Sequence, residues 1–340
     1  MATKKIIISN LIGVFVTIVT LFTQLHEVTA AKTANIAISP VYPSNQIRQN
    51  GIFDLKVGPG QKQTIKLKVV NLSNDSQQVV IKTTNPYTSD AGVLSLDQVK
   101  VVSEQKPSVK FNHLVAEKNR KRDVVIPANK TVEVPITFTT PVKIFPGVVV
   151  GGVLVQAKKT DNPLTHKGVG LKNKFAYTMA VVLKEDDKVA KPDLLLGKVS
   201  AGRFSDAIAI KSVIKNVKPA VVSGMTINAT ITEKKSAKVM GITHKTGLSM
   251  APNSSFRFTN NWAKKSIQPG DYHYKAKIST EDGQKFLLET DFTISVADVA
   301  VINDHNNPWI KWAVALIALT IINLSVWFFS RRRRAKKTDA

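Results

Sequence analysis

The sequence of 340 residues contains no cysteine, and its 24 acidic side chains are half as many as its 48 Lys and Arg. Without cysteine there can be no disulfide framework, thiolate metal site, iron–sulfur cluster or thiol nucleophile. The shortage of acids gives a formal net charge of +24. Residues 31–308 alone carry 39 basic and 22 acidic side chains, so most of the excess belongs to the interior of the chain.

Short motifs of common enzymes are also missing. The sequence has no H-E-x-x-H, no G-x-S-x-G, no P-loop and no glycine-rich dinucleotide motif. The adjacent acids Asp186-Asp187 and Glu281-Asp282 fall on expected turns, where solvation of a hairpin end accounts for them. We therefore predict a protein that is not an enzyme and that needs no cofactor or metal ion.

The first 30 residues have the three parts of a secretory signal peptide. Lys4 and Lys5 precede an apolar stretch at 6–25, and Val28-Thr29-Ala30 supplies small residues for cleavage. An uncleaved membrane anchor is the alternative for this segment, because its apolar stretch is longer than average. Either way, the sequence predicts export of the residues that follow.

Residues 309–330 carry almost no charge and are long enough to cross a bilayer as one helix. Six cations follow in the tail 331–340, and they form a stop-transfer signal that keeps the tail in the cytoplasm. These cations are Arg331, Arg332, Arg333, Arg334, Lys336 and Lys337. We expect a single-pass protein of the cell membrane with residues 31–308 outside, which makes nucleic acid an improbable partner. An exported chain without cysteine is typical of Gram-positive envelopes, which depend little on disulfides.

Alternation of apolar and polar residues recurs throughout the exported region, which predicts β-strands. Ile65, Leu67 and Val69 share one face of an expected strand, and two alternating runs around Asp282-Gly283 predict a hairpin. Convincing helical periodicity is absent beyond a short turn near 113–118. The pattern predicts an all-β fold of two tandem antiparallel β-sandwiches.

Composition divides the chain into segments. The signal peptide (1–30) is followed by a first sandwich (31–157), a polar linker (158–174) and a second sandwich (175–297). We expect a short stalk at 298–308, the transmembrane helix at 309–330 and the basic tail at 331–340.

Several motifs occur in an order that resembles the WxL-interacting proteins, which are cell-surface proteins of Gram-positive bacteria. In the first sandwich these are Phe53-Asp54-Leu55, Pro59-Gly60-Gln61, Val70-Asn71-Leu72-Ser73 and Gly151-Gly152. In the second they are Ala201-Gly202-Arg203, Met250-Ala251-Pro252-Asn253-Ser254 and Pro269-Gly270-Asp271-Tyr272. The chain departs from the pattern at Phe286-Leu287, where a tryptophan is expected.

The resemblance implies two immunoglobulin-like domains. It associates the first with peptidoglycan and with proteins that carry WxL domains, and the second with host-surface components. It therefore implies four kinds of partner: WxL-domain proteins, peptidoglycan or anionic wall polymers, host extracellular components, and the membrane through one helix.

Three groups of residues in the first sandwich are candidate binding sites. Asn45 and Gln46 carry amides that could read sugars or could hold the neighbouring backbone. Lys118, Arg120, Lys121 and Arg122 could contact anionic polymers or form a solvated loop. Gly151 and Gly152 interrupt an apolar strand, which indicates a bulge or an edge that accepts a partner strand.

The favoured hypothesis is a non-catalytic surface protein that scaffolds a complex of wall, partner and host contacts. A membrane-tethered chaperone for the assembly of secreted envelope subunits is the alternative. A stable complex in the mature wall would favour the first hypothesis, and transient binding the second.

Overall fold

The computed structural model describes residues 35–101, 107–158, 175–186, 190–205 and 207–304, together with Leu316 and Thr320. The predicted signal peptide and basic tail lie outside these residues, as does the predicted transmembrane helix apart from those two positions. Among the described residues, no helix is long and apolar enough to cross a membrane. The described chain is built almost entirely of strands, which confirms the all-β prediction.

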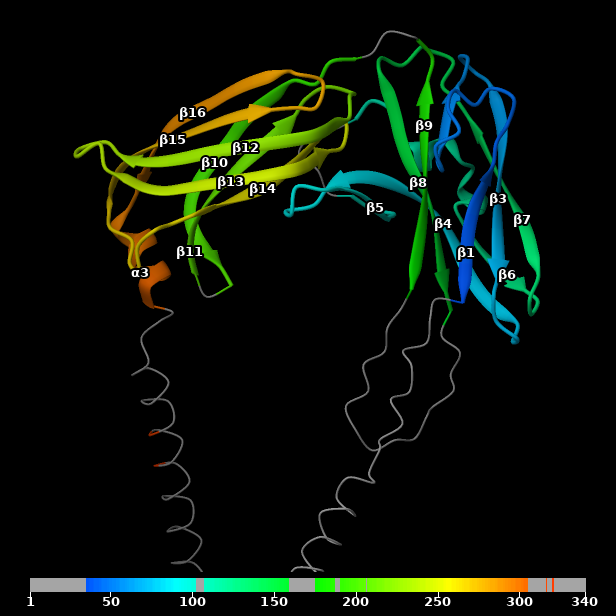
Figure 1. Ribbon diagram of the computed structural model, residues 1–340, viewed down its shortest axis with the longest axis horizontal. Coiled ribbons are helices and arrows are strands. Elements are labelled where there is room, and N and C mark those ends of the chain that lie inside the picture. The colour runs from blue at the N-terminus through cyan, green and yellow to red at the C-terminus, as the bar shows by residue number, and fades with distance from the viewer. Residues whose placement is uncertain are drawn as a thin grey trace, which may run out of the picture. The chain divides into compact units, whose positions relative to one another are not determined.

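The first sandwich has two sheets (Figure 1). The smaller sheet has the order β1 (Ile36–Val41), β3 (Lys62–Asn71) and β7 (Thr131–Thr139). The larger sheet has the order β2 (Phe53–Lys56), β9 (Ala176–Lys184), β8 (Val148–Ala157), β4 (Gln77–Thr88) and β5 (Leu94–Gln98), and β6 (Lys121–Ile126) also pairs with β4. Two short helical turns, α2 (Phe111–Leu114) and η1 (Glu117–Asn119), precede β6 and agree with the predicted turn.

Alternation along the strands produces the core of this sandwich. In β3, Ile65, Leu67 and Val69 are buried while the lysines between them are exposed. The register of β3 and β7 sets Ile65 opposite Ile136 and Leu67 opposite Val134, so both strands turn their apolar residues to the same side. Period-two patterning therefore fixes which face of the sheet is buried.

Strand β9 contradicts the predicted domain boundary. Residues 176–184 were expected to begin the second sandwich, but β9 runs antiparallel to β8 and parallel to β2 in the first. The segment predicted as an inter-domain linker, 158–174, therefore connects two neighbouring strands of one sheet. Composition marked this segment correctly as a connection, but it carries no information about which sheet the next strand joins.

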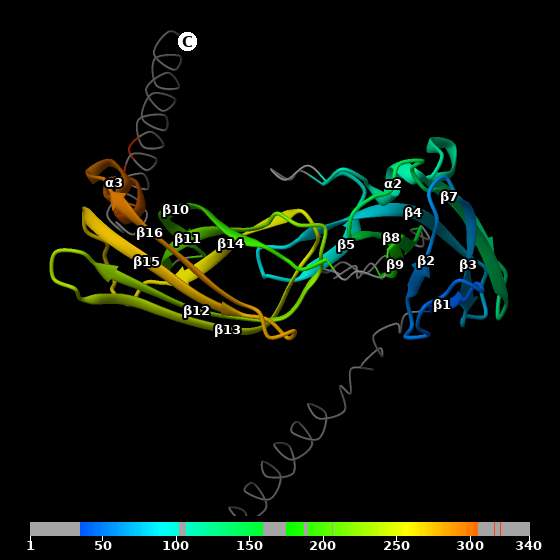
Figure 2. The ribbon, with the colours of Figure 1, turned by 90° about the horizontal axis from the view of Figure 1, so that it is seen from above.

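The second sandwich also has two sheets, which Figure 2 shows as separate layers. One contains β10 (Leu194–Phe204), β11 (Ala207–Asn216) and β14 (Ser254–Asn261). The other has the order β13 (Val239–Met250), β12 (Val222–Glu233), β15 (Gly270–Ser279) and β16 (Lys285–Ile294). The predicted hairpin is confirmed, because β15 and β16 pair around Gly283, whose φ of 81° suits glycine.

One hydrophobic cluster joins the two sheets of the second sandwich. It contains Ile210 and Ile214 from one sheet and Ile227, Tyr272 and Tyr274 from the other. Trp262 meets Tyr272 edge to face at 5.5 Å between ring centroids, and Phe292 stacks on Tyr272 at 5.7 Å. Aromatic packing of this kind adds to the stability that burial alone provides.

The predicted stalk is wrong for residues 298–304, because they belong to helix α3 (Val296–Asp304). Ser295 and Asp298 cap this helix reciprocally: each side chain accepts a hydrogen bond from the other residue's backbone N–H. Ile302 is buried in the core cluster, and Arg203 donates a hydrogen bond to its carbonyl at 3.1 Å. The second sandwich therefore extends through α3. The polar composition of 298–308 could not indicate that Ile302 is buried in the core.

Candidate functional site

The loop that leads into β2 is held by the side-chain amides predicted to bind a ligand. Asn45 Nδ2 donates to the Lys56 carbonyl at 2.6 Å, and Asn45 exchanges two hydrogen bonds with Gln63 on β3. Gln61 extends this amide cluster through a 2.7 Å bond from its Nε2 to Gln63 Oε1. The cluster is half-buried, so its amides are positioned by one another before any ligand arrives.

Gln46 closes the other end of the same loop. Its Nε2 donates to the carbonyls of Arg48 at 2.6 Å and Ile52 at 2.9 Å. Its Oε1 is buried and has no partner, although a buried amide oxygen normally accepts a hydrogen bond. Asn45 and Gln46 therefore shape the loop, and the Oε1 of Gln46 is a buried acceptor that is left unpaired.

Asp54, which sequence reasoning treated only as part of a motif, is a buried carboxylate beside this loop. Its side chain is 3% exposed and lies between Lys184 Nζ, 2.8 Å from Oδ1, and Arg48 Nε, 3.4 Å from Oδ2. Oδ1 receives no well-directed hydrogen bond, so Lys184 acts on it chiefly as a charge. Lys184 belongs to β9, so the ion pair ties β9 to β2, and no local sequence signal reveals it.

The basic segment 118–122 divides into two pairs of residues. Arg120 Nε donates to the Val115 carbonyl at 2.9 Å, and Arg122 donates to the carbonyl of Pro135 on β7. Lys118 and Lys121 are exposed. The structure thus does not bring the four cations together as one free patch, because the two arginines are used to fasten the segment to the sandwich.

Gly151 and Gly152 lie in the middle of the larger sheet. Gly152 is paired with Thr84 of β4 on one side and Ala180 of β9 on the other, and neither pairing shows a register shift near it. The bulge and edge-strand interpretations are therefore wrong. A Cβ at Gly151 would lie 2.2 Å from the Phe111 ring, and one at Gly152 would lie 2.5 Å from Thr84 Oγ1. Close approach from both faces explains the two glycines.

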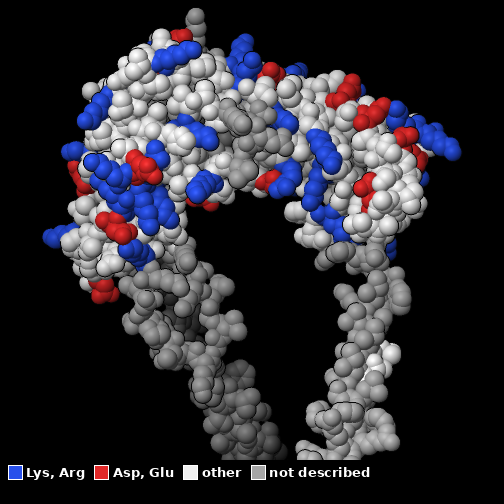
Figure 3. Space-filling view, turned by 180° about the vertical axis from the view of Figure 1, so that it is seen from behind, with Lys and Arg blue, Asp and Glu red and all other residues white. Residues whose placement is uncertain are grey.

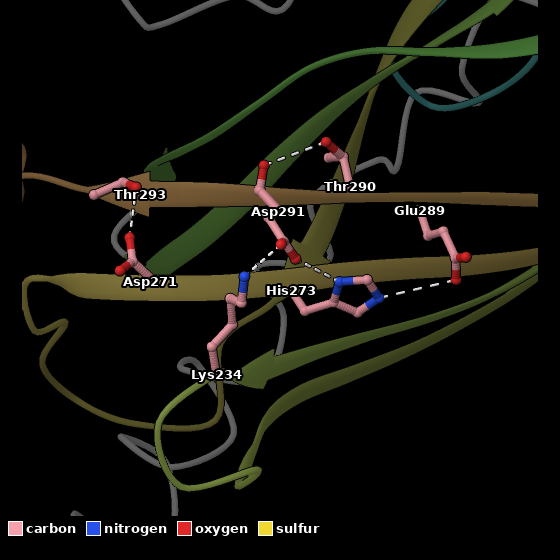
Figure 4. A network of polar contacts seen from close by, with 7 residues as sticks. All are labelled: Lys234, Asp271, His273, Glu289, Thr290, Asp291 and Thr293. Carbon is pink, nitrogen blue, oxygen red and sulfur yellow. Dashed lines mark hydrogen bonds and ion pairs between the residues drawn. The ribbon is translucent and has the colours of Figure 1, made fainter.

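A polar network covers the outward face of β15 and β16 in the second sandwich (Figure 4). His273 Nδ1 lies 2.7 Å from Asp291 Oδ1, and Lys234 also binds the Asp291 carboxylate. Hydrogen bonds from Lys234 and then His273 hold the pKa of Asp291 below its usual range. This network is exposed, and among the described residues no group of His, Asp and Glu converges on a metal site.

Charge is distributed unevenly over the surface. Figure 3 shows Lys and Arg side chains across the visible face, with a dense group on the first sandwich at the left of that view. Acidic side chains are fewer and mostly scattered among them. A surface of this kind attracts polyanions at moderate ionic strength.

Two sandwiches, each made of two sheets, define an all-β protein, and its composition is strongly cationic. Family models match nearly all of the described chain. Residues 37–157 match the model described as WxL Interacting Protein, peptidoglycan binding domain, and residues 166–304 match WxL Interacting Protein, host binding domain. The chain belongs to the WxL-interacting protein family. The second model begins before β9, although β9 completes the first sandwich.

Comparison with curated proteins finds no match. Solved structures similar to the chain include the class 5 fimbriae chaperone CfaA, with 15% identity, a TM-score of 0.32, and coverage of 75% of this chain and 99% of that one. The chaperone–tip subunit complex CsuC–CsuE of Acinetobacter baumannii gives 13% identity, a TM-score of 0.33, and coverage of 75% and 98%. Likeness at these TM-scores carries no argument about function.

Proposed function

We propose that this protein is a non-catalytic scaffold of the cell surface, anchored by the helix predicted at 309–330. The first sandwich binds peptidoglycan and a WxL-domain protein, and the second binds a host-surface component. The observation that carries this proposal is the order of the two family models along one chain, peptidoglycan binding first and host binding second. Both sandwiches are assigned the immunoglobulin-like type as part of the same proposal.

Within the first sandwich, we assign the peptidoglycan contact to the loop held by Asn45 and Gln46. Its amide cluster is pre-formed, which lowers the entropic cost of ordering side chains on binding. The exposed Lys118 and Lys121 lie outside this amide cluster, so the proposed peptidoglycan contact does not depend on them.

The experiment is binding of the full chain, in detergent micelles, to purified peptidoglycan and to a WxL-domain protein across a salt series. Saturable binding that survives high salt supports a shaped site and the scaffold function. Binding to both ligands that disappears at moderate salt contradicts the proposal, because it reduces the interaction to charge. A complex that forms during export and is absent from the mature wall would instead favour the assembly chaperone.

A variant locates the contact. Gln46→Glu keeps the size of the side chain but replaces the Nε2 donor that holds the loop, whereas Gln78→Glu makes the same change at an exposed position of β4. We expect the first to weaken peptidoglycan binding and the second to leave it unchanged. Equal binding by both variants would remove the loop from the proposed site.

A further inference from the structure

The pairing of β4 with β6 sets two lysines directly opposite each other. Lys82 of β4 is the cross-strand partner of Lys121 of β6. Side chains in such a pair leave the sheet on the same face with Cβ atoms about 5 Å apart, and like charges there destabilise the sheet. Nothing in the alternation of either strand requires this arrangement, since Gln or Thr would serve an outward position equally well.

The charges around this pair do not neutralise it. Neither lysine forms an ion pair among the described residues. Asp123 lies two residues after Lys121 on the same face of β6. It forms an ion pair with Lys158, whose Nζ lies 2.9 Å from Asp123 Oδ2. Glu117, at the start of η1, is exposed. The pair is therefore a like-charge site in which neither lysine belongs to an ion pair of the described residues.

The neighbouring segment adds a third lysine in a fixed position. Thr83 N–H donates to the Arg120 carbonyl at 2.9 Å, which fastens the chain after η1 to β4 beside Lys82. Arg120 itself is anchored to Val115, so the segment that carries Lys118 and Lys121 is held at two points. Lys118 is exposed on η1. The Thr83–Arg120 and Arg120–Val115 hydrogen bonds thus hold the segment that carries Lys118 and Lys121 beside β4.

We propose that Lys82, Lys118 and Lys121 form a binding site for a phosphodiester polymer of the protein's own cell wall. Lysine ammonium groups are compact point charges that suit the spread charge of a phosphate without requiring a forked geometry. A polymer with one charge per repeat can place a phosphate between Lys82 and Lys121 and another near Lys118. The site lies within the residues that match the peptidoglycan-binding model, so the polyanion within reach is one that shares the wall with peptidoglycan.

This inference rests on the proposed wall function, and the experiment separates the two. Full chain in detergent micelles is measured against three immobilised probes: poly(glycerol phosphate), heparin, and peptidoglycan stripped of phosphate polymers. Lys82→Gln/Lys121→Gln should weaken binding to poly(glycerol phosphate) about tenfold and leave binding to stripped peptidoglycan unchanged. Failure to bind stripped peptidoglycan by the unaltered chain would count against the proposed function alone.

The matched control is Lys62→Gln/Lys68→Gln, which removes the same charge from the outward face of β3. We expect it to change binding by about twofold or less. If both double variants lose affinity equally, binding is a property of net charge and the site is wrong. If heparin binds more tightly than poly(glycerol phosphate) and with the same sensitivity to Lys82 and Lys121, the ligand is a sulfated glycan and the assignment to the wall is overturned.

Stability supplies a second readout that a merely structural role would not produce. Lys121→Glu replaces the repulsive pair with an attractive one, so it should raise the melting temperature while abolishing binding to poly(glycerol phosphate). A variant that is more stable and still binds as well as the unaltered chain would overturn the proposal.

Discussion

The outward faces of the two sandwiches arrange their charges differently across paired strands. In the second, the register sets His273 opposite Asp291 and Lys275 opposite Glu289, so each basic residue faces an acid. In the first, the register sets Lys82 opposite Lys121. Opposite charges across a ladder support the sheet, whereas like charges weaken it. The β15–β16 ladder therefore sets these two basic residues against acids, whereas the β4–β6 ladder sets two lysines against each other.

Each sandwich has a buried asparagine at the end of one strand, and the two asparagines form the same kinds of hydrogen bond. Asn71 ends β3, and Asn216 ends β11, and both side chains are buried. Each Nδ2 donates to the carbonyl four residues ahead, and each Oδ1 accepts the backbone N–H two residues ahead. The two sandwiches therefore share a buried asparagine arrangement that shapes the turn after a strand, while the charges on their surfaces differ.

The largest effects should come from removing these asparagines. The Asn71 side chain makes five hydrogen bonds and the Asn216 side chain makes three. Loss of the amide leaves buried carbonyls unpaired, so Asn71→Ala should cost about 3 kcal/mol of unfolding free energy and Asn216→Ala about 2 kcal/mol. Denaturant titration measures both, with the exposed Asn74→Ala as control at about 0.5 kcal/mol or less. A cost for Asn71→Ala no larger than that of the control would break the parallel.

Packing at the central strand of the first sandwich gives the next effect. A Cβ at Gly151 would meet the buried Phe111 ring at 2.2 Å, whereas one at Gly202 in β10 would meet only Lys211 Cε at 3.8 Å. Gly151→Ala should therefore destabilise the first sandwich by about 2 kcal/mol, because the core must shift. Melting curves should show no comparable loss for Gly202→Ala. Recovery of stability by adding Phe111→Leu to Gly151→Ala would identify the clash as the cause.

The aromatic core of the second sandwich should respond to alkaline pH. Burial raises the pKa of Tyr274 to about 12, against an ordinary value of 10.0, while its hydroxyl is hydrogen-bonded to Ser212 Oγ at 2.9 Å. Because the pKa of Tyr274 is raised in the folded state, its protonated side chain contributes fully to the free energy of unfolding below pH 10. This contribution is lost as the pH rises toward 12. Tyr274→Phe should cost about 1 kcal/mol at neutral pH.

The same variant should flatten the fall in melting temperature between pH 10 and 12. Tyr274 loses its proton at a lower pH in the unfolded chain than in the folded one, which favours unfolding in this window. Phenylalanine cannot ionise, so the variant lacks this effect. Curves for the two proteins that run parallel through this window would contradict the assignment of the shift to Tyr274.

The smallest effect concerns the exposed network on β15 and β16. Lys234→Gln removes the charged hydrogen-bond donor that contributes most to lowering the pKa of Asp291. The pKa of Asp291 should therefore move up toward its ordinary value. A carboxyl whose pKa is lower in the folded than in the unfolded state contributes stability above its ordinary pKa, and this stability is lost as the pH falls through the folded-state pKa. The variant should therefore lose this stability at a higher pH. Carboxyl NMR titration measures the change. Lys277→Gln, on the same outward face, should leave the Asp291 midpoint where it was.

Local patterns predicted the strands well and their partners poorly. The alternation of Ile65, Leu67 and Val69 identified the buried face of β3, and Asp282-Gly283 identified a hairpin, because both signals lie within a few residues. The position of β9 depends on pairing with β2, far away in the sequence, and no local signal encodes that choice. The polar segment 158–174 falls where the two family models meet, but it does not mark the end of the sheet that β9 joins.

The surroundings of two candidate groups could not be read from the sequence for a related reason. Gly151-Gly152 carries the same letters whether the strand is at an edge or in the middle of a sheet, and only the pairing with β4 and β9 decides. Arg120 and Arg122 looked like free cations because the carbonyls that they bind, at Val115 and Pro135, cannot be identified before the fold is known. Lys82 was overlooked because its partner Lys121 is 39 positions away.

The late arrival of β9 has a consequence for the timing of folding. Phe53 of β2 pairs with Val181, 128 positions later, and a chain is delivered N-terminus first. Until residues 176–184 appear, β2 has no neighbour in its sheet and β8 has one side open. Contacts this distant form slowly, and an open strand edge can pair with another chain. A nascent chain halted before residue 184 would therefore present an unfinished sheet to its surroundings, and the interval before β9 docks is when this protein is most exposed to mispairing.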